Sequence, residues 1–213
     1  MSGNLEKLLS ISDRLLGPEG CPWDKEQTLF TLQPYLLEEV HELLEAIDSL
    51  NPKDMAQELG DVLYTLIFIA KLGEREKKFT LEEAIDEISS KLIRRHPHIF
   101  GDVKTQDLEE ISRNWEEIKK QEFKERKNIL DGIPASLPAL ARAQKIIHKM
   151  KRFNKKEMPV QTCSAEEELG QKLWELLEIA DEKGWNAEDI LRRTASLHEE
   201  KFRQKNTGDN PSA

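Results

Sequence analysis

Two short acidic segments lie close together in the sequence, and their carboxylates could do chemistry. Residues 38–42 read Glu-Glu-Val-His-Glu, and residues 58–61 read Glu-Leu-Gly-Asp. Within each segment the acids are three or four positions apart, so on a helix they would share one face. Two facing helices with such carboxylates make a cage of oxygen atoms, which suits Mg²⁺. The alternative is that both acidic faces are simply solvated.

The elements that must position these acids are predicted to be two helices. An apolar stripe runs beside the first segment from Leu36 to Ile47, with Pro34 in the first turn. The second helix is expected from Pro52, after an Asn51 cap, to about Lys71. Its residues 62–70 are apolar nearly all round, which is typical of a buried helix. Gly60 within it indicates close packing or the close approach of a ligand.

The segment before the first acidic helix, residues 21–28, is expected to be a loop, and it follows a helix predicted over residues 4–16. Trp23 within this loop has two interpretations. It could fill the core beneath a tight connection, or it could stack on a base at the edge of the acidic site.

Basic and aromatic residues follow the acidic helices. A Thr-x-x-Glu capping box at residues 80–83 opens a helix that ends in Lys91, Arg94 and Arg95. These cations either cap the helix dipole or bind phosphate oxygens. A further helix is predicted over residues 107–126. It carries Trp115 one turn before Lys119, and the tryptophan could belong to the core or stack on a base.

The second half of the chain contains a weak internal duplication at an offset of 110 residues. The segment 58–60 falls on the same three residues at 168–170, while Asp61 falls on Gln171, and no Glu-Glu-x-x-Glu precedes the copy. A second functional cage is therefore not expected. We predict a catalytic domain over residues 1–126, a linker with a short basic helix over 127–163, a degenerate helical repeat over 164–205, and a disordered tail over 206–213.

The composition limits the class of protein. Charged residues make up 34% and aromatic residues 6% of the 213 residues, which suits a soluble helical protein. No apolar run is long enough to span a bilayer and no signal peptide is evident, so we expect a cytoplasmic protein without membrane partners whose Cys21 and Cys163 are reduced. The net charge of −9 argues against nonspecific binding of nucleic acid.

Taken together, these blocks resemble the MazG family of nucleoside triphosphate pyrophosphohydrolases. The resemblance covers about the first 150 residues. It rests on the two acidic segments and on further blocks in the same order: Cys-Pro-Trp-Asp at 21–24, Arg-Arg-His-Pro-His at 94–98, Leu-Pro-Ala-Leu at 137–140 and Arg-Ala-Gln-Lys at 142–145. It implies an all-α helical bundle, a homodimer, and hydrolysis of NTPs or dNTPs to the monophosphate and pyrophosphate.

The resemblance also implies roles for individual residues. The ligands of Mg²⁺, for which Mn²⁺ could substitute, would be Glu39, Glu42, Glu58 and Asp61. Glu38 would lie behind these ligands or orient the attacking water. The residues implied to contact the nucleotide are Lys91, Arg94, Arg95, Trp115 and Lys119.

Three other interpretations stay open at this point. The chain could be a helical interaction module with solvated acidic faces. It could be a regulator that binds nucleotides without cleaving them. It could also be a specialised dUTP or dCTP pyrophosphatase on the same scaffold rather than an enzyme of broad specificity.

Overall fold

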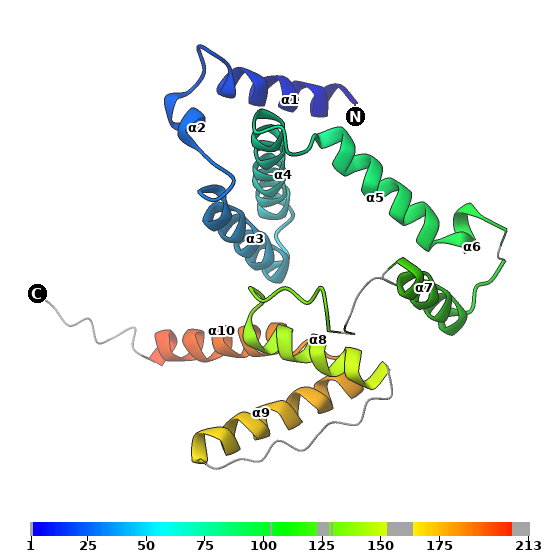
Figure 1. Cartoon of the computed structure of the whole chain (residues 1–213). Helices are drawn as coiled ribbons and strands as arrows, with labels where there is room; N and C mark the ends of the chain where they lie inside the picture. Colours follow the sequence, from blue (N-terminus) through cyan, green and yellow to red (C-terminus); the bar gives the residue numbers. More distant parts are fainter. Residues whose placement is uncertain (1, 103, 123–127, 129, 153–163, 206–213) are drawn as a thin grey trace, which may run out of the picture. The chain divides into compact units, whose positions relative to one another are not determined.

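The structure of the chain is a computed structural model. It describes residues 2–102, 104–122, 128, 130–152 and 164–205. Every regular element in these residues is an α-helix, so the predicted all-α class is confirmed. The helices, drawn in Figure 1, are α1 (Ser2–Leu16), α2 (Pro22–Glu26), α3 (Leu32–Ser49), α4 (Pro52–Arg75), α5 (Leu81–Arg95), α6 (Pro97–Phe100), α7 (Leu108–Glu122), α8 (Ala139–Arg152), α9 (Ala165–Glu182) and α10 (Ala187–Lys205).

The chain divides into two compact units, which we call unit 1 (residues 1–122) and unit 2 (residues 123–213). The predicted tail over 206–213 and the linker residues 153–163 lie outside the described residues, as does the predicted end of the α7 helix at Arg126. None of the helices in the described parts has the length and apolar character needed to cross a bilayer.

Helices α3 and α4 form the centre of unit 1, joined by a connection of two residues. They pack against each other along their lengths (Figure 1). Leu32 of α3 is buried with Phe68 and Leu72 of α4. The predicted cap is present, because the Asn51 side chain accepts a hydrogen bond of 3.1 Å from the backbone N–H of Lys53. This helical hairpin carries both acidic segments.

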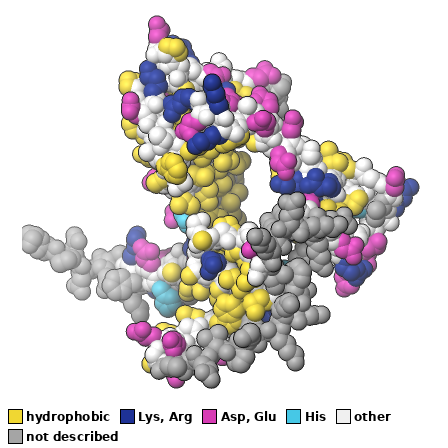
Figure 2. Space-filling view, viewed as in Figure 1, with side chains coloured by type: hydrophobic (Ala, Val, Ile, Leu, Met, Phe, Trp, Pro, Cys, Tyr) yellow, Lys and Arg dark blue, Asp and Glu magenta, His cyan; other side chains and the backbone are white. Residues whose placement is uncertain are grey.

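Helix α4 is not buried all round, contrary to the sequence prediction. Its leucines at 59, 63 and 66 are 58%, 41% and 48% exposed, and Figure 2 shows hydrophobic side chains gathered over this helix. The apolar pattern therefore reflects two apolar faces, of which the described residues of unit 1 cover one. Close packing does not account for Gly60, since no described atom outside its helix lies within 4 Å of where a Cβ would be.

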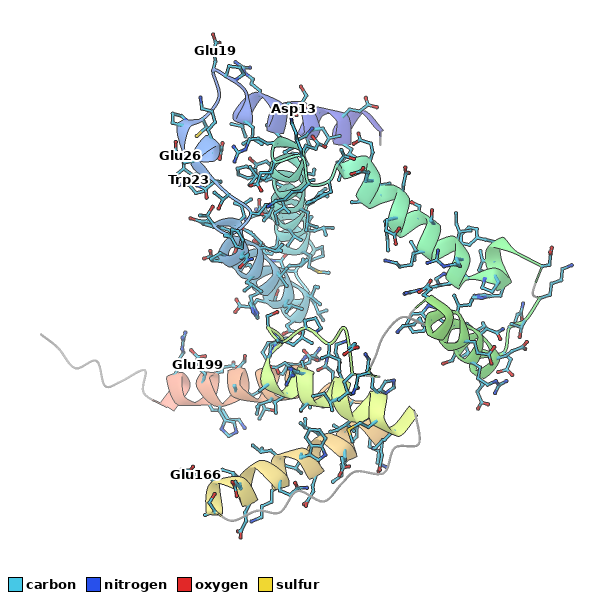
Figure 3. The ribbon with its side chains drawn as sticks, viewed as in Figure 1. Asp13, Glu19, Trp23, Glu26, Glu166 and Glu199 are labelled. Carbon is cyan, nitrogen blue, oxygen red and sulfur yellow. The ribbon has the colours of Figure 1, made fainter. Side chains whose placement is uncertain are left out.

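Helix α1 packs against α4, and the segment around α2 binds the C-terminal end of α4. The Lys71 ammonium lies 2.9 Å from the Asp13 carboxylate of α1, which Figure 3 labels. The Arg75 guanidinium donates to the backbone carbonyls of Lys25 and Gln27 at 3.0 and 2.5 Å. The end of α4 is therefore tied to the connection that leads into α3.

The expected loop over residues 21–28 contains a short helix, α2, because Pro22 stands at its first position and favours a helical turn. Trp23 does not fill the core: it is 52% exposed and meets the Tyr35 ring edge-on at 5.7 Å. Figure 3 labels Trp23 on α2. Of the two interpretations of Trp23, the core tryptophan is therefore wrong, since a five-residue helix cannot bury so large a side chain beneath itself.

The remaining helices form two smaller groups. In unit 1 the capping box is present, with Thr80 and Glu83 exchanging side-chain and backbone hydrogen bonds, and α5 packs against α6 and α7. In unit 2, α8 packs against both α9 and α10 and buries Ile147 completely. The Gln144 side chain of α8 accepts a hydrogen bond of 3.1 Å from the backbone N–H of Ala187 at the start of α10.

The connection between α3 and α4 generates a first prediction. Leu50 has a φ of 53°, in the left-handed region that costs an L residue roughly 1–2 kcal/mol. We expect Leu50→Gly to raise the free energy of unfolding by about 0.5–1 kcal/mol in urea denaturation. The matched variant Leu50→Val should lower it, because a β-branched residue tolerates this conformation least. Equal effects of the two substitutions would contradict the left-handed turn.

Candidate active site

Three of the four predicted metal ligands come together between α3 and α4. One carboxylate oxygen from each of Glu39, Glu58 and Asp61 lies within 4.8 Å of the others. Glu39 comes from α3, and the other two come from consecutive turns of α4. Glu39 and Glu58 are half-buried, whereas Asp61 is exposed. We call this group the carboxylate cluster.

The cluster concentrates negative charge. Partial burial and then the carboxylates of Asp61 and Glu42 raise the pKa of Glu39 above its ordinary value. Partial burial and then the same two neighbours raise the pKa of Glu58 as well. Every charged group that contributes to these two shifts among the described residues is an acid, so the neighbouring charges add to one another.

The other two predicted acids lie around this cluster. Glu42 is outside the group of three, but it lies close enough to Glu58 to contribute to the raised pKa of that residue. Glu38 is exposed, and its charge adds to the rise in the pKa of Glu39. The structure therefore gathers the five predicted acids at one place on the α3–α4 hairpin, three of them within the spacing of a common ion.

The donor set fits a hard divalent cation. The cluster offers carboxylate oxygens, and neither histidine nor cysteine belongs to it. A cation bound between these groups would reverse the electrostatic cost of bringing them together. Glu39, Glu58 and Asp61 are therefore the residues that would hold such an ion, with Glu42 next to them.

The predicted phosphate-binding residues form a second group on α5 and α7. The Arg94 Nε and the Arg95 Nε donate to the Glu122 carboxylate at 2.7 and 3.1 Å. The Arg95 guanidinium also lies 5.6 Å from the centre of the Trp115 ring, and the Lys119 ammonium lies 4.2 Å from it. We call these residues the basic cluster.

Lys91, one turn before Arg95, lies 3.6 Å from the Glu87 carboxylate on its own helix. Figure 1 shows α5 and α7 to one side of the α3–α4 pair, so the ten predicted residues form two groups in the chain rather than a single one.

Comparisons with known proteins show which family the chain resembles. Residues 27–100 match the model of the MazG nucleotide pyrophosphohydrolase domain. The chain is 36% identical to the nucleoside triphosphate pyrophosphohydrolase of Escherichia coli K12, an alignment that covers 94% of this chain and 86% of that protein. It is 35% identical to the nucleoside triphosphate pyrophosphohydrolase/pyrophosphatase MazG of Thermotoga maritima, covering 93% of this chain and 84% of that one.

This chain belongs to the MazG family.

A solved structure is also similar: the crystal structure of a mazG-related protein from Thermotoga maritima has 34% identity and a TM-score of 0.49, and covers 54% of this chain and 98% of that one. The family resemblance seen in the sequence is confirmed, and with it the prediction of an enzyme. The matched MazG domain spans α3, α4 and α5 and so includes the carboxylate cluster, Lys91, Arg94 and Arg95. It ends before α7.

Glu122 is the one residue of the basic cluster that sequence reasoning missed. Its carboxylate is 12% exposed, and hydrogen bonds from Arg95 and Arg94, together with their charges, lower its pKa to about 2. A sequence signal exists, because 115, 119 and 122 share one face of a helix. Nothing in the sequence, however, pairs an acid on this face with arginines 27 residues earlier.

The carboxylate cluster generates a prediction about stability without divalent cations. We expect Glu39→Gln to raise the melting temperature in EDTA by roughly 2–4 °C, because the substitution removes repulsion worth up to about 1 kcal/mol. The raised pKa of Glu39 means that the folded chain loses stability as pH rises through it. The difference between the two proteins should therefore be largest at neutral pH and vanish below pH 4.5.

Addition of Mg²⁺ should reverse this order of stability, so that wild type becomes more stable than Glu39→Gln. Wild type should gain about 2.7 kcal/mol at a cation concentration of 100 times Kd, and Glu39→Gln should gain less. Glu168→Gln is the matched control, because Glu168 of unit 2 corresponds to Glu58 in the internal duplication. This variant should behave as wild type. If Mg²⁺ stabilised all three proteins equally, the cation would not bind at the carboxylate cluster.

The basic cluster generates a second stability prediction with the opposite dependence on pH. Glu122→Gln should lower the free energy of unfolding at pH 7 by about 2 kcal/mol, since two charge-assisted hydrogen bonds are lost. The lowered pKa of Glu122 makes its contribution fully present above about pH 4.5, and the contribution should fall away as the pH falls toward 2. Glu109→Gln is the control, because Glu109 is 86% exposed and should change stability by less than about 0.5 kcal/mol.

Proposed function

We propose that this chain hydrolyses nucleoside triphosphates, NTPs or dNTPs, to the nucleoside monophosphate and pyrophosphate in a reaction that depends on Mg²⁺. The single observation that supports this most is the carboxylate cluster, whose three oxygens within 4.8 Å lie inside the matched MazG domain. Relatives of similar length are named nucleoside triphosphate pyrophosphohydrolases, which supports the same substrate class. The biological role would be to remove unwanted nucleotides from the cellular pool.

Different residues of the chain would have different roles in this reaction. When bound, Mg²⁺ would neutralise phosphate charge and lower the pKa of a water ligand. Glu39, Glu42, Glu58 and Asp61 would hold it. Glu38, exposed beside Glu39, would orient the water whose oxygen bonds to phosphorus as the bond between the α-phosphoryl group and pyrophosphate breaks.

The basic cluster would bind the nucleotide. Lys91 and Arg95 would neutralise charge on the departing pyrophosphate, with Arg94 beside them. Glu122 already holds both guanidinium groups, so it fixes their direction and balances part of their charge. Trp115, with Lys119 4.2 Å from its ring centre, would contact the base or ribose.

We also propose that the enzyme is a homodimer. The leucines at 59, 63 and 66 form an exposed apolar stripe on α4, and α5 exposes Ile85, Ile88 and Leu92 between 46% and 49%. Apolar surfaces of this extent on a folded chain mark a protein interface. A second copy of unit 1 would cover them.

Two alternative functions predict different experimental results from those of this proposal. A specialised dUTP or dCTP pyrophosphatase would release pyrophosphate from one base only, which a competition panel of the standard nucleotides would show. A regulator would bind Mg²⁺–nucleotide complexes without releasing pyrophosphate.

The decisive experiment measures pyrophosphate release from the eight standard NTPs and dNTPs. Glu42→Gln, Glu58→Gln and Asp61→Asn should each reduce kcat/KM by about 100-fold or more, since each removes a charge that holds the cation. Glu168→Gln in unit 2 is the matched control and should retain wild-type activity. Chelation by EDTA should abolish release, and added Mg²⁺ should restore it.

Two outcomes would overturn the proposal. Pyrophosphate release that survives all three substitutions would place the active site elsewhere. Tight binding of Mg²⁺–nucleotide by wild type, without release from any standard or oxidised nucleotide, would identify a regulator.

A further inference from the structure

The two arginines of the basic cluster are already bound by a carboxylate of the same chain. The Nε atoms of Arg94 and Arg95 lie 2.7 and 3.1 Å from the Glu122 carboxylate, and one terminal nitrogen of each arginine lies 2.5 Å from it. Each guanidinium group therefore directs a pair of adjacent nitrogens at Glu122. Arginine binds phosphate through the same kind of paired edge. The Glu122 carboxylate thus lies where phosphate oxygens would bind.

Burial decides how a phosphate can reach these arginines. The side chain of Arg94 is 50% exposed, whereas those of Arg95 and Glu122 are 15% and 12% exposed. An anion from solvent can therefore contact Arg94 directly. It can reach the paired edge of Arg95 only after Glu122 has moved away, because the carboxylate occupies that edge.

The position of Glu122 allows such a movement. Glu122 is the last residue of α7, which packs against α5 (Figure 1). No described side chain of either helix is buried, so no closed apolar core resists a change at this contact. The Trp115 ring centre, 5.6 Å from the Arg95 guanidinium, gives that arginine a second partner. Arg95 therefore remains supported when the carboxylate leaves it.

We propose that Glu122 is an autoinhibitory residue of the nucleotide site: it occupies Arg94 and Arg95 in the chain without nucleotide, and the phosphates of the nucleotide must displace it. This inference rests on the proposed function, since it concerns the same basic cluster. The exchange replaces one anion by another and breaks no covalent bond. A triphosphate can drive it, because it carries more negative charge than a carboxylate and offers several oxygens to both guanidinium groups.

The competition has a defined effect on affinity. A ligand that needs the free arginines binds with an apparent Kd equal to its intrinsic Kd divided by the fraction of chains in which Glu122 has released them. The charge-assisted hydrogen bonds to Glu122 keep this fraction small. Every phosphate ligand that displaces Glu122 is weakened by the same factor, including the product pyrophosphate. Return of Glu122 to the arginines would therefore promote the release of pyrophosphate after hydrolysis.

The test measures binding of inorganic tripolyphosphate and pyrophosphate to the full chain by titration calorimetry, at fixed ionic strength and free Mg²⁺. Glu122→Gln should lower both Kd values by about tenfold or more, because a factor of ten is about 1.4 kcal/mol and a hydrogen bond to a charged group is worth at least that. Glu109→Gln, which removes the same charge from an 86% exposed position of α7, is the matched control and should change Kd by less than about threefold. Addition of Arg95→Gln to Glu122→Gln should remove the gain.

The direction of the change separates this role from a purely structural one. A residue that only supported the arginines would weaken binding when substituted, so an unchanged or higher Kd in Glu122→Gln would overturn the inference. Absence of tripolyphosphate binding to both proteins would overturn it as well. Circular dichroism verifies that each variant is folded at the temperature of the titration.

A second measurement uses the wild-type chain and does not depend on the stability of a variant. Without ligand, hydrogen bonds from Arg95 and Arg94 hold the pKa of Glu122 at about 2, so its carboxyl-carbon NMR signal should stay constant between about pH 4 and pH 6. With saturating tripolyphosphate, the displaced carboxylate should titrate near its ordinary pKa of 4.5. A signal that stays constant in the complex would mean that Glu122 keeps the arginines, contrary to the inference.

Turnover of nucleotides tests the proposed function separately. A chain that binds tripolyphosphate as described but releases no pyrophosphate from nucleotides would contradict the proposed function alone. A chain that hydrolyses nucleotides with a KM that Glu122→Gln does not lower would contradict the inference alone.

Discussion

The mutual repulsion of the carboxylates on α3 and α4 is the constraint on which the rest of unit 1 depends. A helical hairpin that holds these acids within 4.8 Å must draw its stability from elsewhere, because the raised pKa values of Glu39 and Glu58 show that partial burial and the neighbouring acids work against the folded state. The buried contact of Leu32 with Phe68 and Leu72 supplies that stability. The bonds from Arg75 to the carbonyls before α3 oppose separation of the two helices at the other end. The cluster is thus preorganised by groups that take no part in it.

The acidic site could be predicted from the sequence because its information is local. Carboxylates three and four residues apart share a helix face whatever the tertiary structure, and the caps at Asn51 and Thr80 define where the helices begin. The prediction of a fully buried α4 was wrong for a different reason. An apolar helix has the same pattern whether its second face is covered by its own chain or left for another molecule, and hydropathy alone cannot distinguish these. Glu122 was missed because its role depends on a contact between residues far apart in sequence.

Helix α9 of unit 2 corresponds to α4 of unit 1, and comparison of the two shows that a duplicated helix can keep its packing role without its chemistry. The acids that α4 shares with α3 have no equivalent set in unit 2, where no Glu-Glu-x-x-Glu precedes α9 and Asp61 is replaced by Gln171. Unit 2 has the packing of α8 on α9, and α9 carries exposed leucines at 169, 173 and 176. A unit that lacks the site can still contribute contact surface.

Two ion pairs with opposite arrangements of charge have a consequence for helix pairing during folding: Lys71 of α4 lies 2.9 Å from Asp13 of α1, and Asp181 of α9 lies 3.5 Å from Lys151 of α8. Because α1 packs on α4 and α8 packs on the related helix α9, each could in principle pack on the wrong one. Exchange would place Asp13 against Asp181 and Lys151 against Lys71, turning two attractive contacts into two repulsive ones. Each contact is partly exposed and worth no more than about 1 kcal/mol. Together they nevertheless favour the correct pairing, so two related units can fold within one chain with less risk of exchanging helices.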